Sequence, residues 1–173
     1  LVEAMGGEIG VDSQPGQGSV FWLRLPRATQ GEPAPTRPPP RAASPAPVAG
    51  LHTVLYIEDN EVNVVLMAAM LDRLPGVRML SALHPHDGLR LARETVPALV
   101  LLDVQLPDLD GFGVLAQLRA DPATRAVPVV AVSANALQRD IDAALAAGFD
   151  EYLTKPVQLE DLLATVQRRL GRG

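Results

Sequence analysis

The chain has 173 residues, a formal net charge of −5 and a sequence pI near 5.1, and 47% of its residues are hydrophobic although only 3% are aromatic. These values predict an aliphatic core and argue against nucleic-acid binding by the chain as a whole. The chain has no cysteine, which excludes disulfides and thiolate metal sites. It also lacks a long apolar run and a signal-peptide pattern, so we expect a cytoplasmic protein without membrane contact.

The first 26 residues have the pattern of a fragment. LVEAMGG (1–7) is typical of a helix that ends at glycine. EIGVDS and SVFWLRLP predict two strands joined by a QPGQG turn. A helix end and a hairpin are too short to form a domain alone, so we expect them to belong to a larger one.

Residues 26–50 contain eight of the 16 prolines of the chain. Each proline lacks a backbone donor and restricts the residue before it, so this stretch cannot form a helix or a sheet ladder. We expect an extended, semi-rigid linker over residues 27–50. The alternative is an ordered loop wrapped on a domain, which the length and the lack of periodicity disfavour.

Residues 51–173 alternate short apolar runs with helical patterns. The expected strands are TVLYI (53–57), VRMLSA (77–82), ALVLL (98–102), VPVVAV (127–132) and FDEYL (149–153), and the expected helices span residues 61–74, 86–95, 111–120, 135–147 and 157–170. This alternation with short connections indicates βαβ units and a parallel sheet. We therefore predict an α/β fold with a doubly wound, five-stranded parallel sheet of the flavodoxin-like (βα)5 type.

Polar residues follow four of these strands, at the edge where such sheets bind ligands. Glu58 and Asp59 follow the first strand, Asp103 the third, Ser133 the fourth and Lys155 the fifth. Each alone has an ordinary explanation as a helix cap, a turn residue or a surface lysine. All five together, in complementary types, predict a site.

The chemistry of this combination is that of phosphoryl transfer. Three neighbouring carboxylates repel each other unless a cation lies among them, and oxygen ligands favour Mg²⁺. Asp103 is then the expected nucleophile, which forms an aspartyl phosphate. Mg²⁺ and Lys155 neutralise the transferring group, and Ser133 donates a hydrogen bond to it. Asn60 or a neighbour caps the following helix.

Residues 53–170 resemble the receiver domain of two-component response regulators. The stretches that carry the resemblance are VLYIEDNEVN, LVLLDVQLPDLDGF, VVAVSANA and DEYLTKPV. The resemblance implies that Asp103 is the phosphoacceptor, assisted by Lys155 and Ser133, and that Tyr152 is the aromatic switch residue that works with Ser133.

The same resemblance implies the metal ligands. They are Glu58, Asp59, Asp103 and the backbone carbonyl of Gln105, with Mg²⁺ as the cofactor. Two positions depart mildly from the pattern of the family, since Glu58 replaces the commoner Asp and Leu106 stands where Met is usual. The longer Glu58 side chain is compatible with a role through a water molecule, with Asp59 bound directly.

The N-terminal piece resembles the last helix and hairpin of a sensor histidine kinase ATPase domain. The expected organisation is a kinase remnant over residues 1–26, a linker over 27–50 and a receiver over 51–173, as at the C-terminus of a hybrid sensor histidine kinase. This piece lacks the ATP-binding boxes of such kinases, so we expect it neither to bind ATP nor to phosphorylate a histidine. The full-length parent is expected to be a protein-histidine kinase.

The resemblance implies a two-component phosphorelay. Phosphate passes from the phosphohistidine of a sensor kinase or a histidine phosphotransfer domain to Asp103, and the domain catalyses its own phosphorylation and dephosphorylation. Phosphorylation then rearranges the face formed by residues 135–147, 149–153 and 157–170, where a homodimer is expected. Nucleic acid is not an expected partner.

Two alternatives stay open on the sequence. A Mg²⁺ phosphatase of the haloacid dehalogenase type also uses an aspartate nucleophile, but it needs a carboxylate two residues later, where this chain has Gln105. A receiver that acts as a binding module without phosphorylation needs the loss of a site residue, and none is lost.

Overall fold

The computed structural model describes residues 8–14, 18–24 and 51–171. Contacts divide the chain into two units, Leu1–Ser44 and Pro45–Gly173. In the first unit, β1 (Glu8–Gln14) and β2 (Gly18–Arg24) pair antiparallel, which confirms the predicted hairpin. The predicted helix end over residues 1–7 and the linker over 27–50 lie outside the described residues, and the three-part organisation of the chain stays a prediction.

The second unit is built on one parallel sheet. Its strands are β3 (His52–Ile57), β4 (Val77–Ala82), β5 (Leu99–Asp103), β6 (Val129–Ser133) and β7 (Glu151–Thr154). They lie in the order β4-β3-β5-β6-β7, and every neighbouring pair is parallel. This is the doubly wound order of the flavodoxin-like fold, so the predicted fold class is confirmed.

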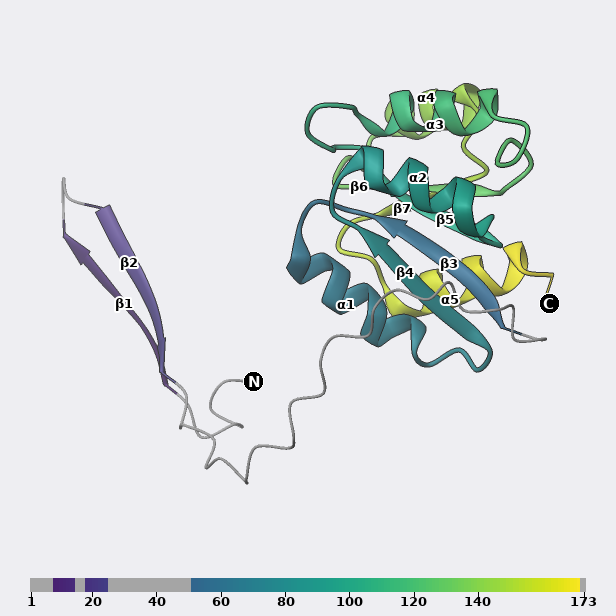
Figure 1. Cartoon of the computed structure of the whole chain (residues 1–173). Coiled ribbons are helices and arrows are strands. Elements are labelled where there is room, and N and C mark those ends of the chain that lie inside the picture. The colour runs from purple at the N-terminus through teal and green to yellow at the C-terminus, as the bar shows by residue number, and fades with distance from the viewer. Residues whose placement is uncertain (1–7, 15–17, 25–50, 172–173) are drawn as a thin grey trace. The chain divides into compact units, whose positions relative to one another are not determined.

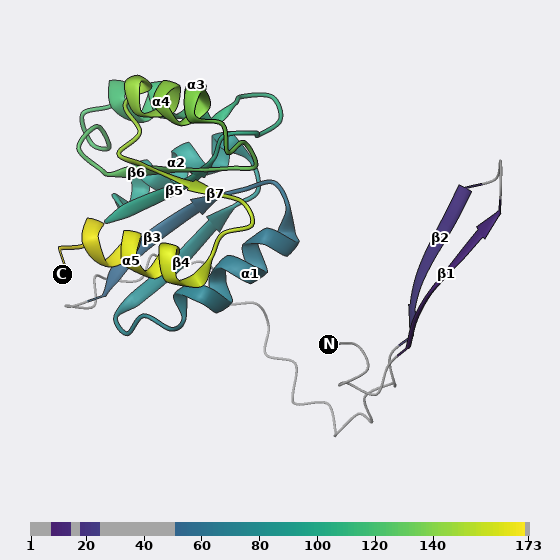
Figure 2. The same ribbon diagram turned by 180° about the vertical axis from the view of Figure 1, so that it is seen from behind.

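Five helices cover the two faces of this sheet (Figure 1). They are α1 (Glu61–Leu71), α2 (Pro85–Thr95), α3 (Gly111–Ala120), α4 (Gln138–Ala147) and α5 (Leu159–Arg169). Helices α2, α3 and α4 lie on one face, and α1 and α5 lie on the other, as the view from behind also shows (Figure 2). Among the described residues, no helix is long and apolar enough to cross a bilayer.

The core consists of two aliphatic layers, one on each face of the sheet. Alternation along β3 assigns its side chains to these layers, because successive residues of a strand point to opposite faces. Leu55 and Ile57 pack in the α2-α3-α4 layer, whereas Val54 and Tyr56 pack in the α1-α5 layer. The central strands β5 and β6 are buried along their whole length, as their apolar sequences predict.

Local signals explain where several helices begin and end. Asn60 caps α1 by accepting a hydrogen bond from the Val62 amide, and Asp110 caps α3 in the same way. Gly148 ends α4 with a φ of 108°, which strains any residue other than glycine. The cap predicted at Asn60 or a neighbour is therefore confirmed at Asn60.

Helix α4 begins three residues later than predicted, at Gln138 instead of residue 135. The backbone of Asn135 is engaged elsewhere, since its amide donates to Ser133 Oγ at 3.2 Å and its carbonyl accepts from the Tyr152 hydroxyl at 2.7 Å. The residue before the helix, Leu137, supplies no side-chain cap. The sequence gives no marker for this start.

Backbone hydrogen bonds continue past the ends of the strands and hold the following residues at the carboxyl edge. The Glu58 amide donates to the Ala82 carbonyl at 3.0 Å, and the Lys155 amide donates to the Ser133 carbonyl at 2.7 Å. Asp103 is the last residue of β5 and lies opposite Val132 of β6. The residues that follow or end β3, β5, β6 and β7 are thereby fixed along one edge.

Candidate functional site

Three carboxylates meet at the carboxyl edge of the sheet. Glu58, Asp59 and Asp103 each offer an oxygen, and these oxygens all lie within 4.8 Å of one another. Glu58 and Asp103 are buried, with 1% and 3% of their surface exposed, whereas Asp59 is exposed. Carboxylates this close repel each other, and burial strengthens the repulsion because the local dielectric is low.

Lys155 bridges the two buried carboxylates. Its Nζ donates to Glu58 Oε2 at 2.7 Å and to Asp103 Oδ2 at 2.8 Å. Burial alone lowers the pKa of an ammonium, but the hydrogen bonds to Asp103 and Glu58 outweigh it and raise the pKa of Lys155 above its ordinary value. The ammonium therefore stays charged, and the cluster retains an excess of two negative charges.

The Glu58 carboxylate is held by two further donors that the sequence analysis missed. The Tyr56 hydroxyl donates to Oε2 at 2.5 Å, and the Asn63 amide donates to Oε1 at 2.9 Å. Burial raises the pKa of Glu58, but the hydrogen bonds from Lys155, Tyr56 and Asn63 outweigh it and hold that pKa below its ordinary value. Burial and then the bond to Glu58 raise the pKa of Tyr56, so its hydroxyl remains a donor.

Asp103 is held from both sides. Its Oδ2 faces Lys155, and its Oδ1 accepts a hydrogen bond from the Gln105 amide at 2.9 Å. The Gln105 side chain is exposed, and Leu106 is buried in the α2-α3-α4 layer, where it takes the place of the usual Met. The loop after β5 is thus held to the core by Leu106, which directly follows Gln105, the residue whose amide binds Asp103.

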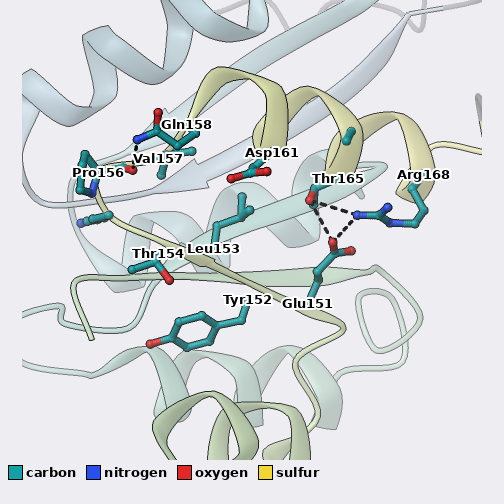
Figure 3. A pocket seen from close by; sticks show the side chains of 12 residues that line it. Glu151, Tyr152, Leu153, Thr154, Pro156, Val157, Gln158, Asp161, Thr165 and Arg168 are labelled. Carbon is teal, nitrogen blue, oxygen red and sulfur yellow. Dashed lines mark hydrogen bonds and ion pairs between the residues drawn. The ribbon is translucent and has the colours of Figure 1, made fainter. Parts of the chain in front are cut away.

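Ser133 and Tyr152 are linked through Asn135. Ser133 is buried at the end of β6, and both it and Tyr152 hydrogen-bond the backbone of Asn135. Tyr152 is half-buried against the α2-α3-α4 layer and points to the opposite side of β7 from Leu153 (Figure 3). The predicted switch roles of Ser133 and Tyr152 stay predictions, and Asn135 is the residue that connects them.

A groove of about 490 Å³ runs along β7 and α5. Its lining includes Lys155 and also Glu151, Thr165 and Arg168, and the polar atoms of these last three point toward one another (Figure 3). Glu151 Oε1 accepts from Thr165 at 2.9 Å and from Arg168 at 2.5 Å. The groove thus borders Lys155 and a second group of charged side chains, but none of the three clustered carboxylates lines it.

Comparison with known proteins gives the class to which this fold and site belong. The family model of the response regulator receiver domain matches residues 54–167. The chain therefore belongs to the response regulator receiver family, and the predicted resemblance is confirmed for this region. Receiver domains take phosphate on an aspartate, and this one is the receiver of a two-component system.

Individual relatives agree with this family. Two-component system protein A of Emericella nidulans is 30% identical over an alignment of 183 positions, which covers 99% of this chain and 26% of that protein. The polar-differentiation response regulator DivK of Brucella anthropi is 33% identical over 119 residues, 69% of this chain and 96% of DivK. The chain thus spans about a quarter of the length of the first relative.

A solved structure gives the same result for the fold. The receiver domain of a sensor histidine kinase from Pseudomonas aeruginosa is 36% identical, with a TM-score of 0.64 over 70% of this chain and 98% of that one. Its structure has a magnesium ion coordinated in the active site cleft. The receiver family disfavours the haloacid dehalogenase alternative, and the kinase remnant over residues 1–26 stays a prediction.

Proposed function

We propose that Asp103 is the phosphoacceptor and that it receives its phosphoryl group from a phosphohistidine. The observation that supports this assignment most strongly is the position of Asp103 at the end of β5, in contact with Lys155 and within the acidic cluster. An aspartate nucleophile needs a cation beside the transferring group, and the ammonium at 2.8 Å provides one. Glu58 is already occupied by three donors, which leaves Asp103 as the buried carboxylate that can react.

Mg²⁺ fits the acidic cluster. The donors are all oxygens, they lie within 4.8 Å of one another, and the excess of two negative charges matches a divalent cation. Asp59, Asp103 and the Gln105 backbone carbonyl are the proposed direct ligands, with Glu58 acting through water. When bound, Mg²⁺ neutralises charge on the oxygens of the phosphoryl group.

Asp103, Lys155 and Ser133 each have a separate role in the proposed phosphoryl-transfer step. A carboxylate oxygen of Asp103 attacks the phosphorus, and the bond from phosphorus to the imidazole nitrogen of the donor breaks. Lys155 moves its hydrogen bond from Asp103 to a phosphoryl oxygen, and Ser133 donates its hydroxyl hydrogen to another. Since Ser133 and Tyr152 share Asn135, this change at Ser133 reaches Tyr152 and the face formed by α4, β7 and α5.

The wider context of this domain belongs to the same proposal. The donor is a histidine of a sensor kinase or of a phosphotransfer domain, and the chain forms the C-terminal part of a hybrid sensor histidine kinase located in the cytoplasm. The alignment with two-component system protein A supports this context, because it covers 99% of the chain and so includes the hairpin. The face formed by α4, β7 and α5 is the proposed surface for a homodimer.

Phosphorylation by a small donor tests the function. The full chain is incubated with acetyl phosphate and Mg²⁺, and its intact mass is measured. We expect one phosphoryl group on the wild type, none on Asp103→Ala, and none on either protein when EDTA replaces Mg²⁺. Undiminished modification of Asp103→Ala would refute the assignment.

A further inference from the structure

The Glu58 carboxylate is almost fully buried and accepts three hydrogen bonds. Asn63 binds Oε1, and Tyr56 and Lys155 both bind Oε2. A carboxylate has about four lone-pair positions, so these donors occupy most of its capacity. Glu58 is therefore fixed within the protein and has little freedom to turn toward a metal.

The two uncharged donors come from both sides of Glu58 in the sequence. Tyr56 lies in β3 with 1% of its surface exposed, and Asn63 lies on the first turn of α1 and is half-buried. Together with Lys155 they border one cavity of about 90 Å³, whose other walls include Leu66, Met67 and Met70. The Glu58 side chain itself is almost fully buried, and the low local dielectric strengthens the hydrogen bonds to its carboxylate.

A glutamate needs such support more than an aspartate does. Its side chain has one more rotatable bond, so its carboxylate can adopt more positions unless it is held. In this structure the carboxylate reaches Lys155, whose Nζ also contacts Asp103 at 2.8 Å. The position of the ammonium beside Asp103 thus depends on the position of Glu58.

We propose that Tyr56 and Asn63 are positioning residues that act through Glu58 to hold the Lys155 ammonium beside Asp103. Their side chains hydrogen-bond Glu58 and not Asp103, and neither is a proposed metal ligand. Their contribution to the reaction rests on the phosphoacceptor function proposed above, but their effect on Lys155 does not. Small displacements of a catalytic group lower rates strongly, by up to about 100-fold for a displacement of about 1 Å.

Lys155 is the only lysine of the chain, so its ammonium can be observed alone. Protein labelled with [¹⁵Nζ]lysine gives one side-chain ammonium signal in NMR spectra, and hydrogen exchange of that signal with water is measured without Mg²⁺ or phosphodonor. We expect slow exchange in the wild type and exchange at least about 10-fold faster in Tyr56→Phe and in Asn63→Leu. Asn63→Gln, which keeps an amide, retains more protection than Asn63→Leu.

A second measurement separates positioning of Lys155 from metal binding. In Tyr56→Phe the rate of phosphorylation by acetyl phosphate at saturating Mg²⁺ falls on the order of 10-fold. The dissociation constant for Mg²⁺ stays within about 3-fold of the wild-type value, because the proposed direct ligands are untouched. If the role of Tyr56 were purely structural, the phosphorylation rate would not fall while the Mg²⁺ affinity stayed unchanged.

The matched control is Thr124→Val. Thr124 is buried, and its hydroxyl donates to the Leu118 carbonyl at 2.9 Å, so this variant also loses one buried hydroxyl bond. Neither its Lys155 signal nor its Mg²⁺ affinity is expected to change. Thermal unfolding establishes that each variant is folded, and Asn63→Leu provides the test if Tyr56→Phe does not fold.

Two outcomes would overturn the proposal. One is a Lys155 signal as protected in Tyr56→Phe and Asn63→Leu as in the wild type. The other is a loss of Mg²⁺ affinity that parallels the loss of rate, which would make these residues supports of the metal site. Absence of phosphorylation in the wild type would refute the proposed function alone, because the exchange measurement needs no phosphodonor.

Discussion

The two ends of β7 carry clusters of charged side chains that differ in their balance of charge. At the amino end, Glu151 accepts hydrogen bonds from Arg168 at 2.5 Å and from Arg169 at 3.0 Å, and Arg169 also donates to the Asp150 carbonyl. At the carboxyl end, Lys155 is the one cationic side chain among the described residues that pairs with Glu58 and Asp103. Asp59 adds a third carboxylate there.

This difference separates a structural role from a functional one. The amino-end cluster joins β7 to α5 and leaves neither Asp150 nor Glu151 without a guanidinium partner, since Arg119 also pairs with Asp150 at 2.9 Å. In the carboxyl-end cluster the three carboxylates still repel one another in the presence of Lys155, and an added cation would reduce this repulsion. The excess negative charge at the carboxyl edge, more than the number of ion pairs, is therefore the feature on which the proposed cation site rests.

The largest expected effect on stability is that of Lys155→Met. This change leaves the buried Glu58 and Asp103 carboxylates without a counterion, so we expect the free energy of unfolding without Mg²⁺ to fall by about 3 kcal/mol. Arg168→Met is the comparison at the other cluster and should cost about 1 kcal/mol or less, because that side chain is 60% exposed and Arg169 remains. Urea unfolding measures both, and equal losses would contradict the distinction.

Addition of Mg²⁺ should stabilise the protein through the carboxyl-end cluster and not through the amino-end cluster. At a concentration about 100 times the dissociation constant, the gain in the free energy of unfolding is about 2.7 kcal/mol. Asp59→Asn should remove most of this gain, and Glu151→Gln should retain it, as thermal unfolding with and without Mg²⁺ can measure. A gain that survives in Asp59→Asn would locate the metal elsewhere.

Loss of one carboxylate should have opposite effects in the two clusters. Glu151→Gln weakens bonds to two guanidinium groups and should lower the free energy of unfolding by about 1–2 kcal/mol. Asp59→Asn relieves repulsion and should raise it by about 0.5 kcal/mol in Mg²⁺-free buffer. Denaturant titrations of the two variants give the signs, and destabilisation by both would break the comparison.

The smallest effect expected is a dependence on acid pH that originates at Glu58. Its pKa lies below the ordinary value of 4.5 in the folded protein, so its stabilising contribution is present above pH 4.5 and is lost as pH falls through the folded pKa. The stability difference between the wild type and Glu58→Gln should therefore shrink when pH falls below the folded pKa of Glu58. A difference that grows on acidification would have the wrong sign.

Strand alternation and strand ends made much of this architecture predictable. The nearly uninterrupted apolar runs at 53–57 and 98–102 can be central strands because helices cover both faces, and the carboxyl ends of parallel strands share one edge. Glu58, Asp59, Asp103 and Lys155 therefore had to approach one another. Their mutual distances depend in addition on the register of the sheet and on side-chain hydrogen bonds such as those of Tyr56 and Asn63 to Glu58.

Tyr56 and Asn63 were not predicted because each has an ordinary explanation. A tyrosine inside a strand is expected in the core, and an asparagine near the start of a helix is expected at the surface. The signal lay in spacing, since Tyr56 is two residues before Glu58 and so lies on the same side of an extended chain. The late start of α4 had no such signal, because it depends on the contact of Tyr152 with Asn135, 17 residues away.

The most direct test of the central claim is chemical mapping of the phosphorylated residue. The full chain is phosphorylated with acetyl phosphate and Mg²⁺, reduced with borohydride, which converts an acyl phosphate to an alcohol, and sequenced by tandem mass spectrometry. The account predicts reduction at Asp103 in the wild type and at no residue in Asp103→Ala. Reduction at Asp59 or Glu58 with Asp103 intact would contradict it.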